Sequence, residues 1–180
     1  VTGVQTCALP ICSPYLYGSD IKPESLIKDQ YRKRFEGYAP DANVAAVDVE
    51  TNAHSEDEEI IMGSVTYKDR AILVIDRNFI PEFANPVPLI HQLAEKYIGE
   101  HMKARNIRLH VRIVENELDV VRTMFKALHK WQPDFVSIWN MAFEINKFLT
   151  CLERFDVEPR QIFCHPSLPD RYKRFYWKED

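Results

Sequence analysis

The 180-residue sequence predicts an α/β protein with one mixed β-sheet flanked by helices. After a first helical segment, three consecutive apolar runs separated by turn residues predict three strands in an antiparallel meander. Two further strand patterns follow, and apolar residues at helical spacing precede and follow each of them. The predicted order of the main domain is therefore βββ-α-β-α-β-α. Its helical crossovers are expected to be right-handed.

Each element has a local signal. Pro23 suits the first turn of a helix, and Gly37 ends that segment. Pro86 precedes the next helical pattern, and Asn116 is the expected N-cap of the one after it. The expected strands are residues 44–50, 59–67, 71–76, 107–114 and 134–139, and the expected helices are residues 24–35, 88–104, 117–131 and 143–155.

The composition is that of a soluble globular protein, with 46% hydrophobic and 28% charged residues. No apolar run approaches the roughly 18 residues of a membrane span, so we expect no membrane partner. The net charge of −4 argues against a protein that binds nucleic acid over its whole surface, although it allows an acidic metal pocket. Cys151 and Cys164 have no CxxC spacing, which favours free thiols in a reducing compartment.

The chain is expected to have three parts. Residues 1–11 resemble the translation of a sequencing-library adapter, so residues 1–12 are expected to be an artefact and are excluded from the fold prediction. Residues 13–40 are expected to form a segment that precedes the main domain. The main domain is expected to cover residues 41–180, which is enough chain for one core.

Two carboxylates follow the apolar start of the first strand. Asp48 and Glu50 are two residues apart, so they are expected on one face of the strand, with Val49 on the other. Adjacent like charges repel, and a divalent cation held by oxygen ligands stabilises such a pair. Glu144 follows the last strand and is the expected third carboxylate. The pattern predicts a metal-dependent phosphodiester-cleaving site, whereas the pair alone could be two solvated edge residues.

The chain resembles the 3′–5′ proofreading exonuclease domain of family B DNA polymerases, in a bacteriophage-like version. Asp-Val-Glu-Thr at 48–51 resembles the first exonuclease motif, and Trp-Asn-Met-Ala-Phe-Glu at 139–144 resembles the second. Tyr17-Gly, Glu115-Asn-Glu-Leu and Gln132-Pro-Asp-Phe-Val resemble further segments of the same enzymes. The order of elements matches the ribonuclease-H-like fold, whose first strand lies centrally in the sheet and whose carboxylates meet at strand ends.

This resemblance implies a two-metal site that uses Mg²⁺ or Mn²⁺ to hydrolyse the 3′ end of single-stranded DNA. It implies that Asp48 bridges both metals, Glu50 holds the metal that activates water, and Glu144 serves the second metal. The other implied partner is the rest of the polymerase chain. A phage-encoded protein of this kind would act in DNA replication in the cytoplasm of the bacterial host.

The resemblance also implies three substrate-binding residues. Asn140 and Phe143 would lie beside the 3′-terminal nucleotides, and Thr51 completes the first motif. Two of these positions have a structural alternative. Asn140 could be a helix N-cap, and Phe143 could pack in the core at the start of a helix.

The sequence departs from the family pattern in two places. Glu144 stands where the family has Asp, and its extra methylene shifts the carboxylate by about 1 Å, enough to reduce activity where positioning is strict. A single nucleotide error in the source read would produce the same change. The third motif, Tyr-x-x-x-Asp, is matched in spacing by Tyr176 and Asp180, but too soon after the second motif, and we interpret it as coincidence. The exonuclease domain is therefore expected to be incomplete at its C-terminus. The polymerase motifs are absent as well, so the chain is not expected to be a complete enzyme.

Two alternatives remain, a stand-alone exonuclease of the same superfamily acting on DNA or RNA, and a non-catalytic nucleic-acid-binding remnant. Among the other polar segments, Glu56–Glu59 is expected to be a solvated turn and not a calcium site. Residues 171–178 interleave basic and aromatic residues, which suits single-stranded DNA or an exposed linker. The histidines fall in separate elements, which argues against a zinc site: His91, His101, His110, His129 and His165.

Overall fold

The computed structural model describes residues 23–37 and 42–177, and the chain divides into two units, Val1–Asp41 and Ala42–Asp180. In the first unit the predicted helix is confirmed as α2, Pro23–Arg34. Within it Asp29 and Lys33 form an ion pair of 2.7 Å, and the rings of Tyr31 and Phe35 lie 4.7 Å apart. The adapter-like residues and Tyr17 lie outside the described residues.

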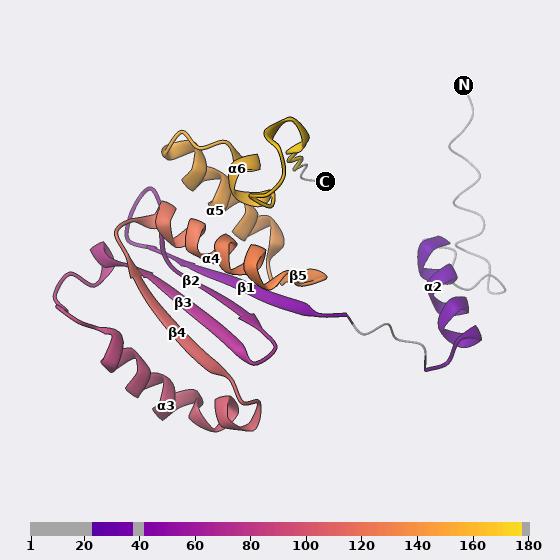
Figure 1. The fold of residues 1–180 in the computed structure, drawn as a ribbon, viewed down its shortest axis with the longest axis horizontal. Helices are drawn as coiled ribbons and strands as arrows, with labels where there is room; N and C mark the ends of the chain where they lie inside the picture. Colours follow the sequence, from indigo (N-terminus) through magenta and orange to yellow (C-terminus); the bar gives the residue numbers. More distant parts are fainter. Residues whose placement is uncertain (1–22, 38–41, 178–180) are drawn as a thin grey trace, which may run out of the picture. The chain divides into compact units, whose positions relative to one another are not determined.

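The second unit contains one five-stranded mixed sheet flanked by helices, as predicted (Figure 1). The strand order is β4-β3-β2-β1-β5. Strand β2 runs antiparallel to β1 and β3, while β5 is parallel to β1 and β4 is parallel to β3. The strands are β1 Val44–Thr51, β2 Ile60–Tyr67, β3 Arg70–Asp76, β4 Arg108–Val114 and β5 Phe135–Ile138.

All the predicted helices are present, and short ones accompany them. The long helices are α3 Val87–Ala104, α4 Glu117–Trp131 and α5 Met141–Arg154. The short ones, which the sequence did not indicate, are α6 Pro159–Phe163 and the 3₁₀ helices η1 Arg77–Phe79 and η2 Asp170–Tyr172. Helices of three to five residues contain too few positions to show a helical period. In the described residues no helix is both long and apolar enough to cross a membrane.

The position of β1 corrects one expectation. The ribonuclease-H-like pattern places the first strand at the centre of the sheet, but β2 is the middle strand among the described residues, and β1 lies between β2 and the edge strand β5. The difference arises because β4 adds to the outer side of β3, which leaves β5 alone on the β1 side. Strand β1 is still hydrogen-bonded to a neighbouring strand on each side, β2 and β5. Its side chains alternate between the two faces of the sheet.

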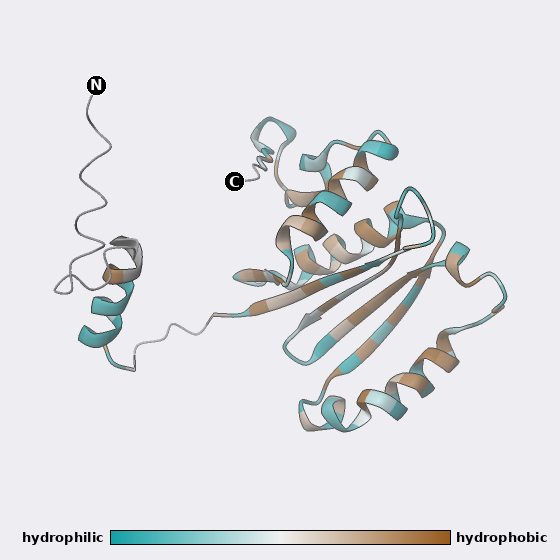
Figure 2. Ribbon diagram, turned by 180° about the vertical axis from the view of Figure 1, so that it is seen from behind, coloured by the Kyte–Doolittle hydropathy of each residue, from teal (hydrophilic) through white to brown (hydrophobic). Residues whose placement is uncertain are grey.

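The two long crossovers place helices on opposite faces of the sheet. The connection β3–α3–β4 moves outward to one edge, whereas β4–α4–β5 moves back across the whole sheet. If both crossovers are right-handed, α3 and α4 must lie on opposite faces. Helix α3 runs beside β4, and α4 lies over β2 and β3 (Figure 1). Figure 2 shows hydrophobic and hydrophilic residues alternating along the strands as brown and teal bands.

The main core lies between the sheet and helices α4 and α5. Strand β1 contributes Ala45, Val47 and Val49 to it, and the opposite side chains of β1 are exposed. The largest buried side chains from the helices are Met124, Phe148 and Leu152. On the other face, Ala71, Ile75 and Val111 are buried on the side where α3 contacts β4. The part of that face formed by β1 carries its two carboxylates.

Candidate functional site

Asp48 and Glu50 lie on the exposed face of β1, as predicted from their spacing. Burial alternates along the strand, so both carboxylates point away from the core that holds Val47 and Val49. Across the antiparallel ladder Asp48 is paired with Ser64. Within residues 23–37 and 42–177 no cation forms an ion pair with either carboxylate, so two like charges stand side by side on an open sheet face. Oxygen ligands of this kind suit Mg²⁺ or Mn²⁺.

The first motif ends in an irregularity of the ladder. The register between β1 and β2 shifts between Glu50 and Thr51, and Thr51 is paired with Ile60 instead of with Ile61. Such bulges bend a strand and re-aim its side chains, and they are frequent near functional sites. Thr51 is half-buried. Its predicted contact with substrate stays a prediction.

The second motif begins at the same end of the sheet. Val47 is paired with Ile138 in the parallel ladder between β1 and β5, so Trp139 leaves the sheet at the level of Asp48. The side chain of Trp139 is 97% exposed, which is rare for a tryptophan in a folded domain. The turn that follows leads directly into α5. The two motifs therefore lie at the same end of the sheet, where the parallel strands β1 and β5 finish.

Asn140 and Phe143 lie at the start of α5, where the structural alternative for each can be examined. The Oδ1 atom of Asn140 accepts a hydrogen bond from the backbone N–H of Phe143 at 3.4 Å, so the N-cap interpretation is confirmed. The ring of Phe143 is 39% exposed, and Lys147 Nζ lies 5.3 Å from its centroid. Core packing of Phe143 was therefore the wrong alternative. Both residues remain candidates for contact with substrate.

Glu144 is where the structure departs most from the expected site. It is 4% exposed, and it shares one stripe of α5 with Phe148, Cys151 and Leu152, which form part of the core. In the described chain its Oε2 atom has no hydrogen-bond partner. That helical spacing was present in the sequence and could have placed Glu144 on the apolar stripe.

The three carboxylates are not brought together. Glu144 belongs to the helix-covered side of the sheet, whereas Asp48 and Glu50 lie on the other side of β1. Across the described residues no group of three or more His, Cys, Asp or Glu side chains is arranged to hold a metal ion. The pair on β1 has the chemistry that a hard cation prefers, but Glu144 does not complete it. Metal binding by all three stays a prediction.

The acidic turn after β1 is attached to α5. Glu58 forms an ion pair with Lys147, and Arg154 Nη2 donates to the backbone oxygen of Asp57 at 3.1 Å. Residues 56–58 are exposed, as predicted for a solvated turn, whereas Glu59, the last residue of the predicted turn, is half-buried. Hydrogen bonds from Ser55 and from the backbone lower the pKa of Glu59 at the end of this turn. The turn therefore links the end of the first motif to the helix of the second.

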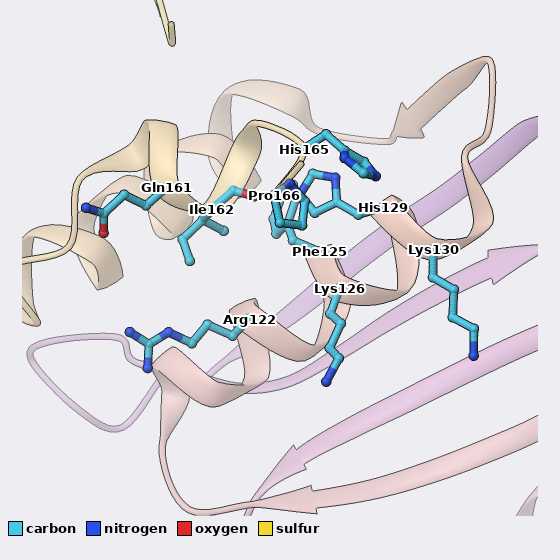
Figure 3. A pocket seen from close by; sticks show the side chains of 9 residues that line it. All are labelled: Arg122, Phe125, Lys126, His129, Lys130, Gln161, Ile162, His165 and Pro166. Carbon is cyan, nitrogen blue, oxygen red and sulfur yellow. Dashed lines mark hydrogen bonds between the residues drawn. The ribbon is translucent and has the colours of Figure 1, made fainter. Parts of the chain in front are cut away.

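The site predicted from the sequence did not include a row of basic residues on α4, which we call the basic stripe. Arg122, Lys126 and Lys130 recur every fourth residue, which places them on one side of the helix. They line a cavity of about 370 Å³ beside α6 (Figure 3). In Figure 3 Lys126 and Lys130 extend side by side, away from the paired rings of His129 and His165. The i, i+4, i+8 spacing was the signal that could have revealed this stripe.

The histidines are less dispersed than the sequence suggested. The ring centroids of His129 and His165 lie 5.4 Å apart, although the two residues come from α4 and from the loop after α6. The Nε2 atom of His129 donates to the backbone oxygen of Ile162 at 2.8 Å, and Nδ1 of His165 contacts the Ser167 hydroxyl at 2.7 Å. These two nitrogens are therefore engaged in hydrogen bonds within the fold.

The basic and aromatic segment near the end of the chain is only partly exposed. The ring of Phe175 stacks on Phe163 of α6 with centroids 4.5 Å apart, and Cys164 Sγ donates to the backbone oxygen of Arg174 at 3.2 Å. Tyr172 and Tyr176 are exposed. The segment is therefore fixed to α6 and is not a free linker. Asp180 lies outside the described residues.

Both cysteines of the described chain are free, as predicted, with Cys151 buried and Cys164 half-buried. No protein-family model matches the sequence, and no curated protein matches it. The assignment of a function therefore depends on the motifs and on the site described above.

Proposed function

We propose that this chain is part of a bacteriophage-like family B DNA polymerase and carries most of its metal-dependent 3′–5′ proofreading exonuclease domain, built on a ribonuclease-H-like sheet. The observation that carries this proposal is the side-by-side exposure of Asp48 and Glu50 at one end of β1, beside the turn at residues 139–144. These are the two segments that resemble the first and second exonuclease motifs. The mixed sheet with helices on both faces is compatible with the proposed fold.

The residues have distinct roles in this proposal. Asp48 and Glu50 would hold the divalent cations, Mg²⁺ or Mn²⁺. Bound there, the cations supply an activated water and stabilise the charge that develops on the leaving oxygen. Asn140, already the cap of α5, would orient the motif, while the exposed rings of Trp139 and Phe143 offer stacking surfaces to the 3′-terminal bases of single-stranded DNA.

Glu144 limits what the chain would do alone. In the proposed enzyme the second motif supplies a carboxylate to a metal, but Glu144 lies on the core stripe of α5. We infer that the rest of the polymerase chain, acting with DNA in the cytoplasm of a bacterial host, completes the site. The same position of Glu144 favours a second candidate function, a nucleic-acid-binding module without catalysis.

Metal binding is tested first, because it does not require activity. Addition of Mn²⁺ should raise the melting temperature of the chain, and the double variant Asp48→Ala, Glu50→Ala should show no such rise. The matched control is Glu82→Ala, Glu100→Ala, which also removes two exposed carboxylates from the described chain and should respond like the wild type. An equal response of all three proteins would contradict a metal site on β1.

Catalysis is tested by degradation of 5′-labelled single-stranded DNA with Mg²⁺ or Mn²⁺. We expect shortening from the 3′ end that increases in Glu144→Asp and disappears in Asp48→Ala. Metal binding without any shortening in Glu144→Asp would favour the non-catalytic candidate. Shortening that survives Asp48→Ala would show that the active site has been assigned to the wrong residues.

A further inference from the structure

A second charged surface lies on the opposite face of the sheet from Asp48 and Glu50. A groove of about 540 Å³ runs between α4 and the outer strands β3 and β4. One wall is formed by alternate residues of β4, Arg108, His110 and Arg112, and the other by Lys126 and Lys130 of α4. We call these residues, together with Arg70 and Trp131, the basic groove.

The topology explains why this groove is open. Helix α4 packs over β2 and β3 and touches β4 much less, because its crossover leads back toward β5 at the far edge. Of the β4 residues that face the α4 side, Val114 packs against the core, whereas Arg108, His110 and Arg112 line the groove. The register confirms the shared face, since Ile72 of β3, which packs against the core, is paired with His110, and Val74 is paired with Arg112.

The charge of the groove is opposite to that of the chain. No Asp or Glu is among its lining residues, whereas the whole chain has a net charge of −4. Asp69 lies near one end, where it forms an ion pair with Arg108 and another of 3.6 Å with Arg70. Hydrogen bonding from Arg108 lowers the pKa of Asp69, so this carboxylate is charged at neutral pH.

The remaining cations have no such neighbour. Among residues 23–37 and 42–177 no carboxylate forms an ion pair with Arg112, Lys126 or Lys130, and all three side chains are exposed. Three uncompensated cations on facing walls repel one another unless an anion enters between them. A basic groove that the fold leaves unpaired is thus ready to bind a negatively charged partner.

The shape and the aromatic residue select the class of anion. Arg108 and Arg112 lie four residues apart on β4, so this wall of the groove covers about 13 Å, which is several phosphate spacings of a nucleic-acid strand. Trp131 lies in the lining, where its ring stacks on Tyr67 with centroids 6.1 Å apart. A row of cations along a groove with an aromatic residue in its wall is the arrangement that binds single strands through phosphates and base stacking.

We propose that the basic groove binds the phosphate backbone of a single-stranded nucleic acid, at a site separate from the carboxylates of β1. The groove belongs to the helix-covered face, so a strand bound there does not occupy the open face that carries Asp48. This site goes beyond the exonuclease function and does not depend on it. It gives the chain a second nucleic-acid-binding site, and binding at this site requires no metal.

The test measures binding in EDTA, where no metal-dependent cleavage occurs. The probe is a fluorescein-labelled oligothymidylate of about 20 nucleotides, followed by fluorescence anisotropy. The triple variant Arg112→Gln, Lys126→Gln, Lys130→Gln should bind at least about tenfold more weakly near 50 mM salt. Because the variant lacks three cations that would each neutralise a phosphate, the slope of log K against log salt should become shallower by about 2.

The matched control removes the same charge elsewhere. Lys96, Lys103 and Arg105 are exposed on or just after α3, and their replacement by Gln should change binding less than about twofold. The assay contains no divalent metal and measures no cleavage, which separates this result from any failure of the exonuclease proposal. Circular dichroism melts of each variant establish that the fold is retained.

Three outcomes would overturn the proposal. One is equal weakening in the groove variant and the α3 control, which would show that only net charge matters. A second is no binding by the wild type at low salt. The third is displacement of the probe by inorganic phosphate together with equal affinity for short and long oligonucleotides, which would show a site for a single phosphate group instead of a strand.

Discussion

The buried Glu117 and the partly exposed Arg154 form an ion pair that joins the start of α4 to the end of α5. Glu117 Oε1 lies 2.9 Å from Arg154 Nη1, and Glu117 Oε2 accepts a hydrogen bond from the backbone N–H of Ile60 at 3.1 Å. Arg154 also donates to the backbone oxygen of Asp57. The ion pair thus connects β2, the turn before it and both helices that cover the core, which keeps the turn after Asp48 and Glu50 in place.

Replacing Arg154 by Met should strongly destabilise the protein. Glu117 is buried, so the change leaves its negative charge away from water and without the counter-ion that Arg154 provides. Breaking such a pair costs about 3 kcal/mol, less in proportion to the partial exposure of Arg154. Urea unfolding measures this free energy. The control Arg122→Met breaks an exposed pair with Asp119 at 3.8 Å and should cost less than about 1 kcal/mol. Equal costs would show that the Glu117 pair contributes no more than a surface pair.

The sequence was sufficient for the strands, the longer helices and the faces of β1. The alternation of Ala45, Val47 and Val49 with Asp48 and Glu50 determines which side chains enter the core, because the period of a strand is fixed by its geometry. The N-cap at Asn116 could also be predicted from the local sequence, since its Oδ1 accepts a hydrogen bond from the N–H of Asp119, three residues on, at 3.0 Å. Both features depend only on residues close together in the sequence.

What the sequence did not determine depends on contacts between distant segments. The position of β4 outside β3 is a property of the whole sheet, and it decides both that β1 is not central and that Arg112 faces Lys126. The proximity of His129 to His165 likewise requires the turn into α6. Glu144 is different, because its spacing from Phe148 already indicated the core stripe, and the family resemblance outweighed that local signal.

Gly63→Ala should destabilise the protein by overpacking. A Cβ on Gly63 would lie 3.0 Å from Met124 Cε and 3.2 Å from Val120 Cγ1, and both residues are fully buried against β2. Overpacking of this kind costs about 1–3 kcal/mol. Thermal and urea unfolding measure it.

The control for this substitution is Gly99→Ala in α3. There the new methyl group meets only the end of the flexible Glu95 side chain, and Ala favours the helix over Gly by up to about 1 kcal/mol. We therefore expect opposite signs for the two substitutions. A neutral Gly63→Ala would mean that Met124 can change its rotamer within the core.

Cys151 should resist alkylation in the folded protein. Burial, and after it the charge of Glu117, raises the pKa of this thiol to about 12. At pH 8 the thiolate fraction is then about 10⁻⁴, and the thiolate is the reactive form. Peptide mass spectrometry after iodoacetamide treatment should show labelled Cys164 and unlabelled Cys151, with both labelled in urea. Equal labelling of the two in the native protein would contradict the packing of α5.

Asp76 should make the protein more stable as the pH falls from neutral. It is 6% exposed at the end of β3, and desolvation raises its pKa, although two donors of Asn78 oppose the shift and the charges of Glu59 and Glu115 add to it. A raised pKa in the folded state means that protonation favours folding. This contribution is complete below the unfolded pKa of about 3.9 and is lost as the pH rises through the folded value.

Asp76→Asn imitates the protonated form and keeps the oxygen that accepts from the N–H of Asn78 at 2.8 Å. We expect the variant to be more stable than the wild type at pH 7.5, and the difference between them to shrink toward pH 5 and below, as followed by urea unfolding. Asp57→Asn, in the exposed turn, is the matched control and should show no such trend. A variant less stable than the wild type at pH 7.5 would show instead that the hydrogen bonds from Asn78 outweigh the cost of burying the charge.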